Sequence, residues 1–92
     1  MTSLTHHAQA RSQQRGIPAP VIETLLDYGH EEHDHHGSRI IFFDHRSRAQ
    51  LRKALGDEHY RRIERHLGTY VIVARGGDVV TVGHRRHHIN RH

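Results

Sequence analysis

The chain has 92 residues, of which fourteen are Arg or Lys, ten are Asp or Glu and thirteen are His; its formal net charge is +4 and it contains neither Cys nor Trp. This length accommodates one hydrophobic core, so we expect a single domain over residues 1–92. The lack of cysteine excludes a disulfide scaffold and thiolate metal sites. No apolar run is long enough for a signal segment or a membrane span, so we expect a cytoplasmic protein without membrane contact.

The positive charge is carried almost entirely by arginine, because Lys53 is the only lysine among the fourteen basic residues. A guanidinium group matches a phosphate with two parallel hydrogen bonds and sheds water more readily than an ammonium group. The composition therefore favours a polyanionic partner, most simply nucleic acid. A coding sequence rich in G and C also favours Arg over Lys, and composition alone does not separate the two explanations.

The first 29 residues predict two helices. Ser3 or Thr5 is suited to cap a helix over residues 4–15, and Gly16 stands where such a helix ends. The apolar face of this helix is thin, and three polar residues share one stripe: His7, Arg11 and Arg15. Two prolines open a second helix over residues 18–28. Its apolar residues form a stripe that faces the core: Val21, Ile22, Leu25 and Leu26.

The middle of the chain predicts two strands and a helix. Residues 30–36 are polar and suit an edge strand, whereas the β-branched and aromatic residues within 39–44 predict a second strand. Ser47 is the expected N-cap of a helix over residues 49–67. Gly56 interrupts or kinks this helix.

Residues 69–86 are expected to form a hairpin at the centre of the sheet. Two β-branched runs, residues 70–74 and 79–82, flank a Gly76-Gly77-Asp78 turn that tolerates positive φ. Both runs are apolar on both faces, as is typical of central strands. The second run leads directly into His84, Arg85 and Arg86, so a basic cluster is expected at one end of the sheet.

The expected elements, in chain order, are two helices, two strands, a helix and two strands. This order is typical of an α+β domain in which N-terminal helices pack on a four-stranded, mostly antiparallel sheet. Residues 87–92 are expected to fray.

Two short motifs at the two ends of the chain point to a family. The first is His7-Ala8-x-x-Arg11 followed by Arg15-Gly16-Ile17, and the second is Val80-Thr81-Val82-Gly83-His84-Arg85. Over nearly its whole length the chain resembles the bacterial family called domain of unknown function 4258, which is similar to RelE-like toxins and related small ribonucleases. The resemblance implies two helices on a four-stranded antiparallel sheet. It also implies a toxin-like or RNA-directed role, with free or ribosome-bound RNA as partner and, in some cases, a cognate antitoxin.

Metal-free RNA cleavage requires a base for the 2′-hydroxyl proton, an acid for the leaving 5′-oxygen, and cations near the phosphorus. His7 and His84 are our candidates for the two proton carriers, because imidazole titrates near neutrality. The candidate phosphate ligands are Arg11, Arg15, Arg75, Arg85 and Arg86. These residues act together only if the first helix crosses the end of the sheet where the basic cluster lies, which the fold resemblance implies.

Three other interpretations remain open at this point. The basic face binds phosphate without catalysis, or the chain is a non-catalytic DNA- or protein-binding module on the same scaffold, or it is a His-rich metal carrier. The metal interpretation is the weakest, because His33 and His35 share a strand face but lack the third and fourth ligands of a zinc site. We therefore predict no specific metal site and no cofactor.

Overall fold

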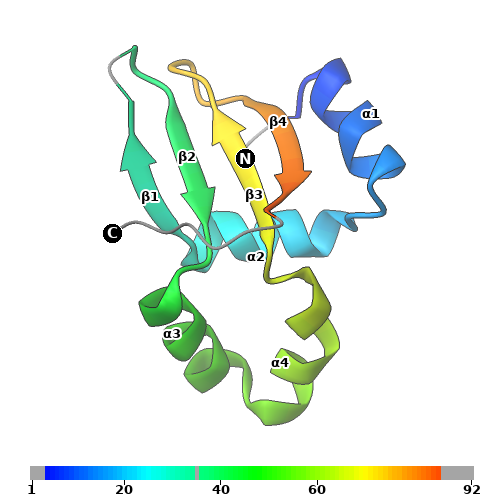
Figure 1. The fold of residues 1–92 in the computed structure, drawn as a ribbon, viewed down its shortest axis with the longest axis vertical. Coiled ribbons are helices and arrows are strands. Elements are labelled where there is room, and N and C mark those ends of the chain that lie inside the picture. Colours follow the sequence, from blue (N-terminus) through cyan, green and yellow to red (C-terminus); the bar gives the residue numbers. More distant parts are fainter. Residues whose placement is uncertain (1–3, 35, 86–92) are drawn as a thin grey trace.

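The computed structural model describes residues 4–34 and 36–85, which form helices and one sheet (Figure 1). The elements in chain order are α1 (His6–Gln14), α2 (Ala19–Tyr28), β1 (His30–His33), β2 (Arg39–Phe42), α3 (His45–Leu55), α4 (Asp57–Ile63), a short 3₁₀ helix η1 (Glu64–His66), β3 (Thr69–Val73) and β4 (Val79–His84). The prediction of an α+β domain is confirmed.

The four strands form one sheet in the order β1-β2-β3-β4, and each neighbouring pair is antiparallel. Sequential strands are therefore also spatial neighbours, and the predicted antiparallel sheet is confirmed. The prediction that both strands of the last hairpin are central was wrong, because β3 is central but β4 lies at an edge of the sheet. A parallel bridge joins Leu4 to Val79, the first residue of β4, and places Leu4 against the free edge of that strand. Figure 1 shows α1 beside that edge.

Local hydrogen bonds define both ends of α1. Thr5 is the N-cap, since its hydroxyl accepts from the Ala8 amide at 3.2 Å. At the other end Gly16 has a φ of 65°, and the Ile17 amide reaches back to the Ser12 carbonyl at 2.9 Å. This is the C-terminal motif that glycine permits, because a left-handed residue there satisfies carbonyls that the helix leaves free. The helix bounds agree with the sequence to within two residues.

The core lies between the N-terminal helices and one face of the sheet. Ala8 is the buried residue of α1, and α2 contributes the predicted stripe. The sheet contributes aliphatic side chains that are almost fully buried: Ile41, Val71, Val73, Val79 and Val82. Gly29 ends α2 where a side chain has no space, because a Cβ there would lie 2.6 Å from the Leu25 carbonyl oxygen. Its role is close packing and not the positive φ common at helix ends, since its φ is −69°.

A bulge in β4 brings two core valines to the same face. Val79 and Val82 are three residues apart, so strict alternation would point them to opposite faces. The register shifts between Ile72 and Val73, which pair with Thr81 and Val79 respectively, and Val80 is the extra residue. A bulge of one residue restores the common orientation, and Val79 and Val82 are 0% and 1% exposed.

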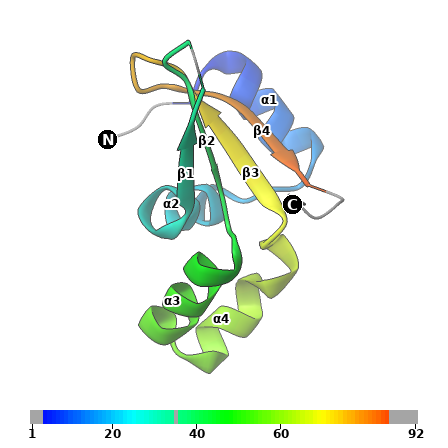
Figure 2. The same ribbon diagram turned by 60° about the vertical axis from the view of Figure 1, so that its left-hand side comes forward.

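The helices α3 and α4 form a hairpin beyond one end of the sheet in both views (Figures 1 and 2). Gly56, with a φ of 84°, joins them, which confirms the predicted interruption. The predicted cap was wrong: Asp44, not Ser47, is the N-cap of α3, so the helix begins earlier than the expected residue 49. Ser47 is the third residue of the helix and completes a reciprocal capping box with Asp44.

Candidate functional site

The end of β4 meets the C-terminal end of α1. His84 is the last residue of β4, and its Nε2 lies 3.1 Å from the Arg15 carbonyl oxygen. At the other end of the same two elements, the Thr5 amide donates to the Val79 carbonyl at 3.0 Å. The helix therefore runs alongside β4 in the same direction and reaches the end of the sheet that carries the predicted basic cluster.

His7 and His84 lie near opposite ends of α1. His7 is exposed, and its Nε2 accepts a hydrogen bond of 3.4 Å from Arg11 Nε. The helix rises by about 1.5 Å per residue, so His7 lies roughly 12 Å along the axis from Arg15, whose carbonyl His84 contacts. The structure does not bring the two predicted proton carriers together around one phosphate.

Arg85 lies over the sheet face that is opposite the core. Its guanidinium carbon is 4.3 Å from the centre of the Phe42 ring and 5.9 Å from that of Tyr70. Its amide donates to the Gly68 carbonyl, which ties the end of β4 to the residue before β3. Cation–π contacts of this kind stabilise by about 0.5–2 kcal/mol. This predicted phosphate ligand therefore has a packing role in the fold.

The other predicted phosphate ligands that the structure describes come from two different elements, α1 with its C-cap and the β3–β4 turn. Arg15 is exposed at the end of α1, and Arg11 donates to His7. Arg75 lies in the β3–β4 turn, where its side chain covers Gly37 so closely that a Cβ there would be 2.5 Å from Nε. Arg86 lies outside the described residues.

His66, in η1, is close enough to His84 for the charges of the two side chains to interact. Burial lowers the pKa of His66, and the charges of Arg65 and His84 lower it further. Arg65 Nε lies 3.4 Å from His66 Nε2, which assigns that nitrogen as the acceptor. His66 is only 9% exposed. Sequence spacing gave no sign of this pair, because strand register is what brings His84 opposite Thr69 and close to η1.

Residues 45–67, which we call the basic segment, carry the whole positive excess of the chain. They contain seven Arg or Lys and three Asp or Glu, whereas the remainder contains seven of each. The segment comprises α3, α4 and η1 and has few buried residues, with none in α4. A count of charge by predicted element would have found this asymmetry from the sequence.

A groove of about 520 Å³ lies between α3 and α4. We call it the α3–α4 groove; its lining residues are His45, Arg48, Ala49, Arg52, Lys53, Asp57 and Tyr60. Four of them, at positions 45, 48, 52 and 53, are basic or imidazole side chains from one face of α3. Spacings of three and four residues place side chains on one helix face, so this part of the site was readable from the sequence.

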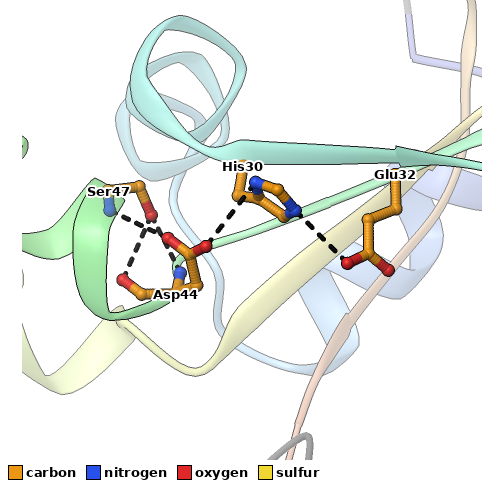
Figure 3. A network of polar contacts seen from close by, with 4 residues as sticks. All are labelled: His30, Glu32, Asp44 and Ser47. Atoms are coloured by element: carbon orange, nitrogen blue, oxygen red, sulfur yellow. Dashed lines mark hydrogen bonds and ion pairs between the residues drawn. The ribbon is translucent and has the colours of Figure 1, made fainter. Parts of the chain in front are cut away.

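A chain of polar contacts joins β1 to the start of α3 (Figure 3). His30 lies 3.5 Å from Asp44 and 3.2 Å from Glu32. The hydroxyl of Ser47 bonds only to the main chain of Asp44 in this network, and Ser47 is buried. A nucleophilic serine needs its hydroxyl on the histidine, so the network caps α3 and does not form a catalytic triad.

Within residues 4–34 and 36–85, no three His, Asp or Glu side chains are grouped as metal ligands. His33 has Glu31 as its neighbour, at 3.9 Å, and His35 lies outside the described residues. Among the described residues no helix is both long and apolar enough to cross a membrane.

Comparison with family models, curated proteins and solved structures finds no match to this chain.

Proposed function

We propose that this chain is a cytoplasmic RNA-binding domain with a RelE-like, toxin-type scaffold, and that it contacts RNA mainly through the basic segment. The observation that carries the proposal is the charge distribution: the segment has a net charge of +4, and the remainder has none. A one-sided positive field attracts a polyanion and orients it during the encounter. The resemblance of the two terminal motifs favours RNA over DNA as that polyanion. A cognate antitoxin is the expected protein partner.

The test compares neutralised variants of the two halves of the molecule. In the first variant, Arg48, Arg52 and Lys53 are changed to Gln; in the control, Arg11, Arg15 and Arg75 are changed to Gln. Each removes three charges, and glutamine is well tolerated in helices. Each phosphate contact contributes about −0.7 to the slope of log K against log salt for single-stranded RNA.

We expect the slope to become shallower by about 2 in the first variant and to change little in the control. Equal changes of the slope in the two variants would mean that RNA binds positive charge equally well on both parts of the surface. If the wild type does not bind RNA, the proposal is wrong, and the protein-binding module is the remaining alternative.

RNA cleavage is the second candidate function, favoured by the proximity of His66 to His84. A neutral imidazole is ready to accept a proton at neutral pH, and His66 is held in that form. In this scheme the base takes the 2′-hydroxyl proton, the 2′-oxygen bonds to phosphorus, and the 5′-oxygen leaves with a proton from the acid. The products are a 2′,3′-cyclic phosphate and a 5′-hydroxyl.

The cleavage hypothesis is tested by RNA turnover, with and without ribosomes, for the wild type and His84→Ala. Loss of one proton carrier is expected to slow cleavage by about 10²–10⁴-fold while RNA affinity stays the same. The same assay on His7→Ala separates the two histidine assignments, because His7 is remote from His84. An unchanged rate in His84→Ala would leave the non-catalytic binding module.

A further inference from the structure

The α3–α4 groove differs from the rest of the basic segment because it combines fixed cations with an aromatic ring. Arg52 and Lys53 come from the end of α3, and Tyr60 comes from α4. Charged residues elsewhere in the segment, such as Arg61, lie on exposed helix surface and outside the groove lining. The groove therefore offers two different kinds of contact to one ligand.

Arg52 is held in position by two neighbours. Its Nε donates to Asp57 Oδ1 at 2.9 Å across the Gly56 turn, and its guanidinium carbon is 5.6 Å from the centre of the Tyr60 ring. In the part of the chain that the structure describes, Nη1 and Nη2 donate to no protein group. A guanidinium with a fixed plane and two remaining N–H edges is suited to a phosphate, since less side-chain freedom is lost on binding.

The positive charge of the groove exceeds what its one acid neutralises. Hydrogen bonding to Arg52 lowers the pKa of Asp57, so this carboxylate is ionised at neutral pH and is already paired. The charges of Arg48 and Lys53, which also line the groove, are therefore not neutralised by Asp57. Lys53 has no ion-pair partner among the described side chains. Within the residues that the structure describes, the one hydrogen bond of the Arg48 side chain is long, 3.4 Å from Nη2 to the Leu67 carbonyl.

The size of the groove fits a small ligand unit. A volume of about 520 Å³ falls within the range of roughly 300–1,000 Å³ that is typical of small-molecule sites. Tyr60 is partly buried against the core, which holds its ring in place where it lines the groove, with the Arg52 guanidinium over one of the ring's two faces. An aromatic side chain of this kind provides a flat surface for an unpaired base, and only unpaired bases expose their faces.

The geometry points to a nucleotide site: the α3–α4 groove holds one unpaired nucleotide of the bound RNA, with its phosphate on Arg52 and Lys53 and its base against Tyr60. This inference deepens the proposed function and rests on it. It assigns the groove a preference for single-stranded over duplex RNA, which the charge of the basic segment alone does not give.

The test uses the full chain and RNA binding as a function of salt. Lys53→Gln and Arg61→Gln each remove one charge from the basic segment, but only Lys53 lines the groove. We expect the slope of log K against log salt to become shallower by about 0.7 in Lys53→Gln and to stay the same in Arg61→Gln. Equal slopes for the two variants would overturn the phosphate assignment.

Tyr60 is tested with two substitutions that separate the ring from the hydroxyl. Tyr60→Phe keeps the stacking surface and is expected to retain wild-type affinity for single-stranded RNA. Tyr60→Leu removes the ring and is expected to weaken binding about tenfold or more, without change in the salt slope. Wild-type affinity in Tyr60→Leu, with circular dichroism showing that it is folded, would overturn the base assignment.

A second measurement separates failure of this inference from failure of the proposed function. The ¹⁵N-labelled chain is titrated with 5′-UMP and, separately, with inorganic phosphate. We expect UMP to shift the amide signals of Arg52, Lys53 and Tyr60, and phosphate to shift only the first two. If RNA binds but UMP leaves these signals unchanged, the groove is not the nucleotide site and RNA binding stands. If UMP binds here but RNA does not, the proposed function fails, and the groove is a site for a free nucleotide and not for RNA.

Discussion

The basic segment and the rest of the described chain are held together in different ways. We call the rest of the described chain the framework; it comprises residues 4–34, 36–44 and 68–85. The framework contributes most of the core. Together with the residues that the structure does not describe, it contains equal numbers of acidic and basic residues. The basic segment contributes two fully apolar buried residues, Leu51 and Leu67, together with Ser47 and His66. Folding free energy therefore comes mainly from the framework, whereas the charge that attracts a ligand is concentrated on a lightly anchored helical hairpin.

This difference in burial determines where substitutions are tolerated. Surface helices with few buried side chains accept changes of charge at little cost to stability, so the basic segment is suited to changes in ligand specificity. The three points where it joins the framework are the exceptions. They are the cap at Asp44, the buried side chain of Leu51, and the turn that contains His66 and Leu67.

The largest effect is expected for Leu51→Ala. Leu51 is fully buried in the core, so truncation leaves a cavity and is expected to lower the free energy of unfolding by about 2–5 kcal/mol. Leu55→Ala is the matched control, since Leu55 lies one turn later and is only partly buried. Urea denaturation measures both. Equal losses would mean that Leu51 is not the main anchor of the segment.

The second largest loss of stability is expected on removal of the α3 N-cap, Asp44. Replacing Asp44 by Ala removes the acceptor of the Ser47 amide and is expected to lower the free energy of unfolding by about 1 kcal/mol. Asp44→Asn is the control, because asparagine also caps helices and removes only the charge. If Asp44→Ala is as stable as Asp44→Asn, the cap does not hold this junction.

The charge of Asp44 adds a pH dependence to this comparison. Burial, the largest single influence, raises the pKa of Asp44, but the hydrogen bonds from Ser47 and the charge of His30 outweigh it, so the net shift is downward. A carboxylate with a lowered folded pKa stabilises the folded state above its unfolded pKa of about 3.9. That contribution is lost as the pH falls through the folded pKa. The difference in stability between wild type and Asp44→Asn is therefore expected to shrink below pH 4.

The two regions also differ in how well the sequence predicts them. The periodicity of α2 and the β-branched runs of β3 and β4 were sufficient to predict the core, because burial selects apolar residues at fixed spacing. The sequence pattern did not predict the bulge at Val80, which depends on pairing with β3. It also placed the cap of α3 on Ser47, since Asp44 and Ser47 are both good caps and their reciprocal bonding is seen only in three dimensions.

The candidate site was harder to predict than the fold. His7 and Arg11 lie on α1 as predicted, whereas Arg15 is the C-cap just after the helix; the length of the helix separates His7 from His84. Arg85 was predicted to be a phosphate ligand, and only the structure shows that its guanidinium lies over the Phe42 ring. The proximity of His66 to His84 depends on contacts between segments far apart in the sequence. Local patterns carry no information about such contacts.

A smaller effect is expected at the third junction, where His66 is buried. Because burial lowers the folded pKa of His66, the neutral form is favoured in the folded state. Protonation then favours the unfolded chain, so the contribution is complete above the unfolded pKa of about 6.5 and decreases as the pH falls toward the folded pKa. Wild type is therefore expected to lose more stability than His66→Gln between pH 7 and pH 5. Thermal melts across that range measure the loss. His59→Gln, at an exposed site in α4, is expected to follow the wild type; parallel curves for wild type and His66→Gln would contradict the prediction.

The smallest change in stability is expected from metal removal. This experiment tests whether a bound metal ion joins the basic segment to the framework. A metal bound only by the folded chain would raise stability in proportion to the logarithm of its concentration over Kd. The histidines described in the basic segment, His45, His59 and His66, do not group with other ligands from the framework, as far as residues 4–34 and 36–85 are concerned. We therefore expect EDTA to change Tm by less than about 1 °C, below the shift of several degrees that a change of ~1 kcal/mol produces in a domain of this size. A large drop that stoichiometric Zn²⁺ reverses would show that a metal contributes to the fold. In that case the junctions at Asp44, Leu51 and His66 would no longer account for how the basic segment is held.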